Sequence, residues 1–166
     1  LPGVRADELT TNAVRFMDTS GSSYEEEKES AGSSLANPEE AILAIKKASD
    51  LIALGVSPKD IAIITPYTAQ VRQLRDQMIH DAVEIGSIDS FQGREKEAVI
   101  ISLVRSNQGN EIGFLKDTRR MNVALTRARR KLIVIGDSTT ISSHPFYAGL
   151  LDHFDQIDAY RGLWDE

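Results

Sequence analysis

The sequence predicts an α/β fold in which a mostly parallel β-sheet is covered by helices on both faces. Short strand-like apolar segments alternate with segments of helical period along most of the chain. Several of the strands are apolar throughout, which is typical of strands buried on both sides in a parallel sheet. The length of 166 residues fits one domain, and the chain shows no internal repeat. We therefore expect a single domain over residues 1–166.

The first strand is predicted at residues 14–18, where apolar side chains alternate with polar ones. The clearest helix start follows at Asn37, because Asn is a favoured cap and Pro38 occupies the first helical position. Glu40 stands where a capping-box glutamate would lie. Apolar residues then recur with a helical period, and Gly55 ends the helix.

The remaining elements are predicted from the same two patterns, the alternation of a strand and the 3.6-residue period of a helix. We expect further strands at residues 61–65, 83–88, 98–104 and 132–136, and further helices at residues 69–80, 117–128 and 145–154. Residues 19–36 are polar and acidic, and they predict a mobile acidic loop. Residues 155–166 form a tail in which no element is predicted.

Composition excludes several classes of site. The chain has no cysteine, which excludes disulfides, thiol nucleophiles and cysteine zinc sites, and its three histidines lack metal-binding spacing. We therefore expect no metal site in this chain and an intracellular location, cytoplasmic or, in a eukaryote, nuclear. No apolar run approaches the roughly 18–20 residues of a membrane span, so no membrane partner is expected. The first residues lack signal-peptide order, and we expect a chain cut from a longer one.

The net charge of −6 conceals a basic segment at residues 116–131. This segment carries a charge of +6, and the remaining residues sum to −12. Its cations are Lys116, Arg119, Arg120, Arg127, Arg129, Arg130 and Lys131. A local basic patch indicates a nucleic-acid partner, but a solvated, salt-bridged helix face would give the same count.

Polar segments follow three of the expected strands. They are residues 65–70, 89–95 and 105–107. Ligands of open parallel sheets bind beyond the carboxyl ends of the strands, so we expect all three segments on that one rim. Their hydroxyl and amide groups, near a basic helix, suit phosphate oxygens.

Arg127 comes near the end of the expected helix 117–128. A permanently charged guanidinium is what a phosphoryl-transfer site uses to stabilise charge on the transferring group. An arginine at this place also complements the negative C-terminal end of a helix. The spacing alone leaves both roles open.

Five stretches carry recognisable strings of residues, and two of these strings, F-Q-G-R-E-K-E and N-V-A-L-T-R-A-R, are highly specific together. The five stretches are I-T-P-Y-T-A-Q (64–70), S-I-D-S-F-Q-G-R-E-K-E (87–97), V-R-S-N (104–107), G-F-L (113–115) and R-R-M-N-V-A-L-T-R-A-R (119–129). In this order and spacing they resemble motifs IV, V and VI of superfamily 1 helicases. The similar subgroup contains the nonsense-mediated-decay helicase, senataxin and the immunoglobulin mu-binding helicase. The resemblance covers nearly the whole chain and weakens in the acidic loop and after about His153.

The resemblance implies a three-layer RecA-like domain, the second of the two in such a helicase. The sequence has no G-x-x-x-x-G-K-[ST] phosphate loop and no D-E-A-x segment for magnesium. In this family both belong to the first RecA-like domain, and ATP with Mg²⁺ lies between the two domains. The implied partners are that first domain, within the same full-length chain, and single-stranded DNA or RNA.

The resemblance also implies roles for particular residues. Arg127 is implied to be the arginine finger on the γ-phosphate, with Gly93 against the nucleotide and Glu95 on its ribose side. The residues implied to touch the nucleic-acid backbone are Thr65, Pro66, Ser87 and Asp89. Without the resemblance, Gly93 is equally a turn glycine, and Glu95 is equally a salt-bridge partner of Arg94, Lys96 or Arg127.

The function expected from the resemblance is the C-terminal half-motor of an ATP-dependent helicase that translocates on single-stranded nucleic acid. The isolated chain is expected to be inactive as an ATPase. One alternative is a non-catalytic module that binds nucleic acid or a partner through residues 116–131. Another is a small-molecule α/β enzyme of nucleotide-binding type, which is less favoured because no G-x-G-x-x-G follows the first strand.

Overall fold

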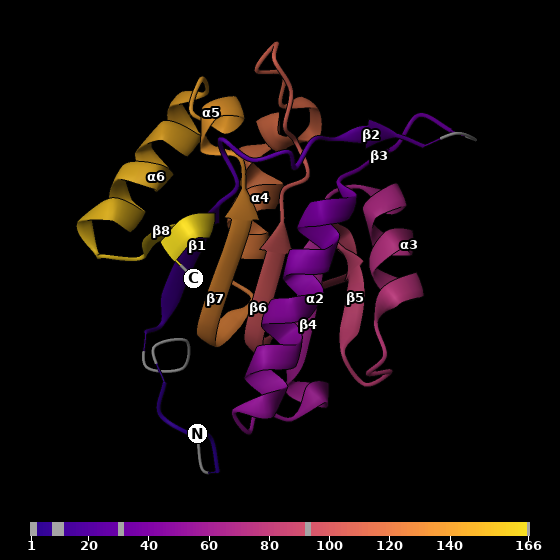
Figure 1. The fold of residues 1–166 in the computed structure, drawn as a ribbon, viewed down its shortest axis with the longest axis vertical. Coiled ribbons are helices and arrows are strands. Elements are labelled where there is room, and N and C mark those ends of the chain that lie inside the picture. The colour runs from indigo at the N-terminus through magenta and orange to yellow at the C-terminus, as the bar shows by residue number, and fades with distance from the viewer. Residues whose placement is uncertain (1–2, 8–11, 30–31, 92–93, 166) are drawn as a thin grey trace.

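A six-stranded, entirely parallel sheet forms the centre of the molecule (Figure 1). The computed structural model describes residues 3–7, 12–29, 32–91 and 94–165. The strand order is β5-β4-β6-β7-β1-β8. These strands are β1 (Val14–Asp18), β4 (Ile61–Thr65), β5 (Glu84–Ser87), β6 (Lys96–Ser102), β7 (Ala128–Gly136) and β8 (Tyr160–Gly162).

Helices cover both faces of the sheet, which confirms the predicted three-layer α/β RecA-like architecture (Figure 1). One face carries α2 (Pro38–Ala53) and α3 (Thr68–Gln77). The other carries α4 (Thr118–Leu125), the short α5 (Ser138–Ile141) and α6 (Pro145–Gln156). Each face has its own hydrophobic core, because alternate side chains of a strand point to opposite faces. The run Ile61–Ile64 of β4 is apolar throughout for that reason.

The start of α2 confirms the predicted cap and corrects the predicted capping box. The side chain of Asn37 accepts a 3.1 Å hydrogen bond from the backbone N–H of Glu40, as an N-cap should. The Glu40 carboxylate does not return this bond. It accepts hydrogen bonds from Ser102 and from the backbone of Val104 instead, because the carboxyl end of β6 lies against the helix.

The boundaries around α4 differ from those predicted. The helix ends at Leu125, three residues before its predicted end, and β7 begins at Ala128, four residues before its predicted start, so Arg129 and Arg130 lie on this strand. Pairing with β6 explains the difference, since Lys96 and Ala128 are register partners. Arg129 and Arg130 follow at an irregularity in the register between β6 and β7, and regular pairing resumes at Lys131 with Ala98.

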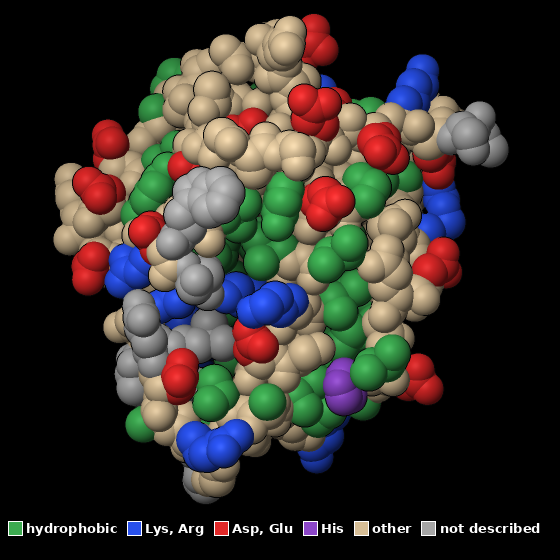
Figure 2. Space-filling view, in the orientation of Figure 1, with side chains coloured by type: hydrophobic (Ala, Val, Ile, Leu, Met, Phe, Trp, Pro, Cys, Tyr) green, Lys and Arg blue, Asp and Glu red, His purple; other side chains and the backbone are tan. Residues whose placement is uncertain are grey.

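Two segments without predicted elements contain short strands. In residues 19–36, β2 (Glu27–Lys28) pairs with β3 (Leu35–Ala36), and the tail contributes β8 to the sheet edge beside β1. The described residues also form 3₁₀ turns, namely η1 (Pro58–Asp60), η2 (Ile88–Phe91), η3 (Gly113–Lys116) and η4 (Leu163–Asp165). No helix within the described ranges is long and apolar enough to cross a membrane. On the face that carries α2 and α3, acidic side chains are dispersed rather than gathered (Figure 2).

Candidate nucleotide and nucleic-acid sites

The parallel strands divide the predicted site residues between two opposite edges of the sheet. Thr65 and Ser87 are the last residues of β4 and β5, and they are register partners at the carboxyl edge. Glu95 and Arg127 directly precede β6 and β7, whose first residues pair with each other at the amino edge. The expectation that residues 89–95 lie on the carboxyl rim is therefore wrong for Glu95, and Arg127 lies at the amino edge as well.

Chain connectivity explains this division. Because β5 and β6 are parallel, the segment between them must return from the carboxyl edge to the amino edge, and α4 makes the same return before β7. The segment that contains η2 and helix α4 contact each other along the way. Asp89 and Arg120 lie 3.6 Å apart near the carboxyl edge, and Arg127 donates to the backbone carbonyl of Arg94 at 3.1 Å near the amino edge.

At the amino edge, Arg127 has only neutral partners. Its Nε donates to the carbonyl of Val123 at 3.1 Å, its Nη1 to the carbonyl of Arg94 at 3.1 Å, and its Nη2 to the hydroxyl of Thr126 at 3.2 Å. No carboxylate in the described part of the chain forms an ion pair with it. The bond to Val123 caps the last turn of α4, so the helix-complementing role left open by the sequence is present. The positive charge nevertheless remains uncompensated.

The neighbouring arginines are neutralised. Arg129 pairs with Glu95 at 3.3 Å and with Glu97 at 3.6 Å, and Arg130 pairs with Glu97 at 3.1 Å. Glu95 is thus a salt-bridge partner, but of Arg129 rather than of the three residues that the sequence offered. The side chains of this pair are half exposed, at 56% and 50%, and such pairs contribute only about 0–1 kcal/mol. Gly93 lies outside the described residues.

At the carboxyl edge, three of the four predicted nucleic-acid residues line one small pocket of about 70 Å³. These residues are Pro66, Ser87 and Asp89, and the wall opposite them includes Phe114 and Arg120. A wider hollow of about 320 Å³ shares Ile88, Asp89 and Arg120 with this pocket and extends to Arg119 and Val123. The two hollows adjoin each other beside α4, and we call them together the rim groove.

Thr65 does not line the rim groove. Its side chain is fully buried, and its hydroxyl has no hydrogen-bond partner among the described residues. Asp89 lines the groove but carries a negative charge, which repels phosphate, and it faces Arg120 instead. The geometry therefore gives the four predicted residues different environments, although they adjoin each other at the ends of β4 and β5.

The basic segment is divided rather than continuous. Arg129 and Arg130 lie at the amino edge with their glutamates, and Lys131 is buried with its ammonium donating to the carbonyl of Asn12. Lys116 and Arg119 are exposed near the carboxyl edge, and within the described ranges neither forms an ion pair. Both interpretations of the charge count are thus partly correct, because part of the segment is salt-bridged and part is uncompensated.

A buried polar network, which the sequence did not indicate, connects the motifs behind the carboxyl edge. Gln70, fully buried, donates to the hydroxyl of Ser102 at 3.1 Å and accepts from the backbone of Asn37 at 2.9 Å. Ser102 in turn donates to Glu40 at 2.6 Å. Burial raises the pKa of Glu40 to about 7, and the hydrogen bonds from Ser102 and Val104 oppose this only in part. In the sequence Glu40 looks like an ordinary capping residue, because Ser102 and Val104, its hydrogen-bond partners, are more than 60 residues away.

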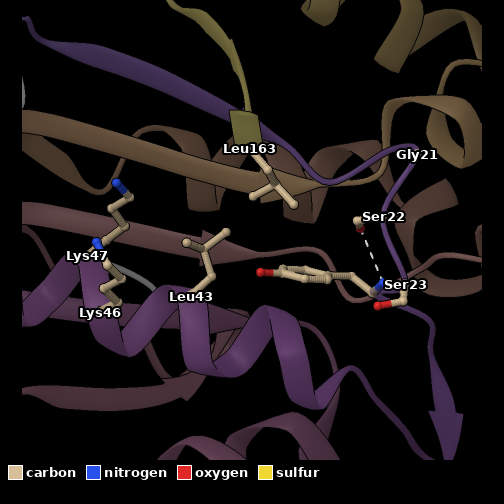
Figure 3. Close-up of a pocket in the computed structure, with 8 residues that line it drawn as sticks. Gly21, Ser22, Ser23, Leu43, Lys46, Lys47 and Leu163 are labelled. Atoms are coloured by element: carbon tan, nitrogen blue, oxygen red, sulfur yellow. Dashed lines mark hydrogen bonds between the residues drawn. The ribbon is translucent and has the colours of Figure 1, made fainter. Parts of the chain in front are cut away.

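A mostly apolar cavity of about 520 Å³ lies away from both edges, between α2 and residues 21–24 (Figure 3). Leu43 and Leu163 point toward each other across it. Lys46 at its margin pairs with Asp50 at 3.2 Å. None of the predicted site residues lines this cavity, so it is separate from the two candidate sites.

Fold and site geometry together define the class of protein: a RecA-like α/β domain with an arginine at one sheet edge and, at the other, a groove lined by both arginines and aspartates. A family model described as "AAA domain" matches residues 3–139. The chain belongs to this family and, with the relatives described next, to the second RecA-like domains of superfamily 1 helicases.

Three relatives illustrate the similarity. DNA-binding protein SMUBP-2 of Rattus norvegicus is 46% identical over 167 residues, which cover 99% of this chain and 17% of that protein. Regulator of nonsense transcripts 1 of Dictyostelium discoideum is 42% identical over 84% of this chain and 11% of that protein. For the DNA replication ATP-dependent helicase/nuclease DNA2 of Mus musculus, the identity is 39%, over 87% of this chain and 14% of that protein. The chain therefore spans less than a fifth of each of these relatives.

Proposed function

We propose that this domain is the C-terminal half-motor of an ATP-dependent helicase, which couples ATP hydrolysis to translocation on single-stranded DNA or RNA. The observation that best supports the proposal is the uncompensated charge of Arg127, held by neutral acceptors at the amino edge. Arg129 and Arg130, at the start of β7, are both neutralised by glutamates. A guanidinium with no carboxylate partner is suited to receive the oxygens of a γ-phosphate.

In this proposal, ATP lies between the amino edge and a first RecA-like domain of the same full-length chain. Arg127 stabilises negative charge that develops on the γ-phosphate, and Glu95 accepts a hydrogen bond from a ribose hydroxyl after its weak pair with Arg129 opens. Gly93 lies against the nucleotide. The described residues contain no group of three or more acidic, His or Cys side chains that could hold a metal ion. The resemblance to superfamily 1 helicases assigns the Mg²⁺ ligands to the first domain.

The nucleic acid, in the same proposal, crosses the carboxyl edge along the rim groove. Pro66 and Ser87 contact its backbone directly, whereas Asp89 acts by orienting Arg120 toward a phosphate. Thr65 supports this surface from beneath, since its side chain is buried. The name of the SMUBP-2 relative describes a DNA-binding protein, and that of the mouse DNA2 relative describes an ATP-dependent helicase.

The test compares the full-length protein with the 166-residue chain in a steady-state ATPase assay, with and without single-stranded oligonucleotide. We expect strand-stimulated hydrolysis by the full-length protein and none by the isolated chain, which lacks a phosphate loop. If the isolated chain hydrolyses ATP rapidly and Arg127→Ala abolishes this hydrolysis, the half-motor proposal is wrong.

A second candidate function is a binding module that uses no ATP. The exposed charges of Lys116 and Arg119 favour it, because they can attract a phosphate backbone without any nucleotide site. Strand binding by the full-length protein that is salt-dependent but unaffected by ATP analogues would select this alternative.

A further inference from the structure

One exposed aromatic side chain at the carboxyl edge has no role in the proposal above. Phe114 is 65% exposed, and it is the one aromatic residue among the large apolar side chains most exposed in the described part of the chain. It lies in η3 and forms part of the wall of the rim groove. Burying a phenyl ring would stabilise the fold, and an exposed ring gives up this stabilisation. The exposed position of Phe114 therefore needs an explanation.

The turn that presents Phe114 is firmly anchored. The residues at its base, Ile112 and Leu115, are almost completely buried, with exposures of 2% and 0%. Gly113 has a positive φ of +50°, and a Cβ at this position would overlap the guanidinium of Arg105. The backbone therefore passes directly over the buried Arg105–Tyr67 pair. This packing fixes the turn and leaves Phe114 pointing outward.

A second ring supports Phe114 from below. The ring of Tyr67 is 3% exposed and lies 5.4 Å from that of Phe114, with the planes inclined at 38°. The hydroxyl of Tyr67 accepts a 3.1 Å hydrogen bond from Arg105, which is held in turn by Glu26 at 3.0 Å. One side of the Phe114 ring thus rests on a rigid base, and much of the remaining ring surface is open to solvent.

Two cations without an ion pair in the described part of the chain, Lys116 and Arg119, follow Phe114 within five residues, and Arg119 lines the groove. Arg120 lines the same pocket as Phe114 and is paired there with Asp89 and Asp117. A rigid aromatic face beside cations that follow a groove is the arrangement by which proteins bind single strands without reading their sequence. The cations attract phosphates, and the ring stacks on a base.

We propose that Phe114 is a stacking platform for one nucleobase of a single strand lying in the rim groove. This inference rests on the proposed function, since it deepens the nucleic-acid site of that proposal. Because every base has a π-face, the contact is independent of sequence. It gives the groove a fixed point for one nucleotide, while phosphate contacts alone would allow the strand to slide.

The test uses the full-length protein and single-stranded oligonucleotides carrying 2-aminopurine at successive positions, at one fixed salt concentration. In the wild-type protein, we expect the fluorescence of one position to be quenched by stacking. Phe114→Ala should abolish that quenching and weaken binding by about fivefold to a hundredfold. Phe114→Trp should retain both, and Phe114→Leu, which keeps the apolar bulk without the π-face, should lose the quenching.

Two other outcomes have distinct meanings. If the wild-type protein binds strand and hydrolyses ATP in a strand-dependent manner, but the Phe114 variants bind equally well with unchanged quenching, the stacking inference is wrong and the half-motor proposal stands. The stacking inference is equally wrong if Phe114→Ala alters ATPase activity or unfolding alone, because Phe114 would then pack against another part of the protein. If the wild-type protein neither binds strand nor hydrolyses ATP, the proposed function fails, and the stacking inference fails with it.

Discussion

Arg127 donates a 3.1 Å hydrogen bond from its Nη1 to the backbone carbonyl of Arg94. This bond joins the residue before β7 to the segment that leads into β6, so the guanidinium is oriented by backbone from two different motifs. A backbone acceptor cannot be titrated or removed by mutation of a side chain. The orientation of Arg127 is therefore determined by the fold itself.

The first prediction concerns this arginine. In the full-length protein, Arg127→Ala should lower kcat for strand-stimulated ATP hydrolysis by roughly 10³-fold or more, because an arginine finger acts on charge that develops in the transition state. Arg127→Lys should rescue little, since an ammonium lacks the planar fork. Steady-state ATPase assays with saturating single strand measure the effect, alongside a strand-binding titration that should change little.

Arg130→Ala is the matched control for this prediction. Arg130 is equally basic, lies three residues away and is paired with Glu97 at 3.1 Å, so its loss removes the same charge without touching the proposed finger. If Arg127→Ala retains near-normal turnover but loses strand binding, the residue belongs to the nucleic-acid site and its assignment as a finger is wrong.

The second prediction concerns salt. Binding of single strands by the isolated chain should be weak and should fall steeply between low and physiological salt, because it relies on a few phosphate contacts in an acidic protein. Arg119→Ala should reduce the slope of log K against log salt by about 1. Lys46→Ala, which removes a cation from the opposite face, should leave the slope unchanged. Tight binding that ignores salt would contradict the prediction.

The third prediction concerns Glu40, whose pKa is raised to about 7 by burial. An unfolded glutamate titrates near pH 4.3, so between about pH 4.5 and 7 the native state binds the proton more tightly than the unfolded state. The free energy of unfolding should therefore fall as the pH rises through this window, by on the order of 3 kcal/mol. Denaturant titrations of the 166-residue chain at several pH values measure the slope.

Glu40→Gln should remove this pH dependence, since the amide oxygen can keep the hydrogen bonds from Ser102 and Val104 without a charge. The control is Glu39→Gln on the exposed side of the same turn, which should retain the slope. An unchanged slope in Glu40→Gln would show that the wild-type dependence arises elsewhere.

The fourth prediction concerns the loop that precedes α4. Gly113→Ala should destabilise the fold by about 1–2 kcal/mol through backbone strain alone, because Gly113 has a positive φ. The overlap of the new Cβ with Arg105 should add to this loss of stability. Gly109→Ala, in the same loop, meets only ordinary contacts at 3.6 Å or more and should be nearly neutral. Chemical denaturation compares the two variants, and equal effects would show that the close approach at Gly113 is relaxed in solution.

Much of the sheet was predictable because the apolar pattern of a strand lies within the strand's own residues. The strand Ile61–Thr65 has the bounds that its unbroken apolar run predicts, and the cap at Asn37 is likewise a matter of adjacent residues. Elements that depend on distant pairing were not predictable. β8 pairs with β1, from the other end of the sequence, and β7 begins at Ala128, whose register partner is Lys96 of β6.

The candidate sites divide in the same way. Motif strings identify Arg127 and Ser87 by residue type, but their separation onto opposite edges follows from the direction in which each connection crosses the sheet. The pairing of Arg105 with Glu26, 79 residues earlier, has no signal in either local sequence. Phe114 is a lone aromatic beside a glycine in the sequence, and only its exposure above Tyr67 distinguishes it.

The position of β1 in the sheet has a consequence for synthesis on the ribosome. Both neighbours of β1, namely β7 and β8, come from the C-terminal quarter of the chain. While the chain emerges, the nascent Val14–Asp18 segment has no edge to pair with until residue 136 has left the exit tunnel. This strand is therefore open to chaperones and to other nascent chains for most of the synthesis of this domain. A ribosome-stalled chain that ends before β7 should accordingly be cleaved by protease near β1, and a chain that includes β7 and β8 should be protected there.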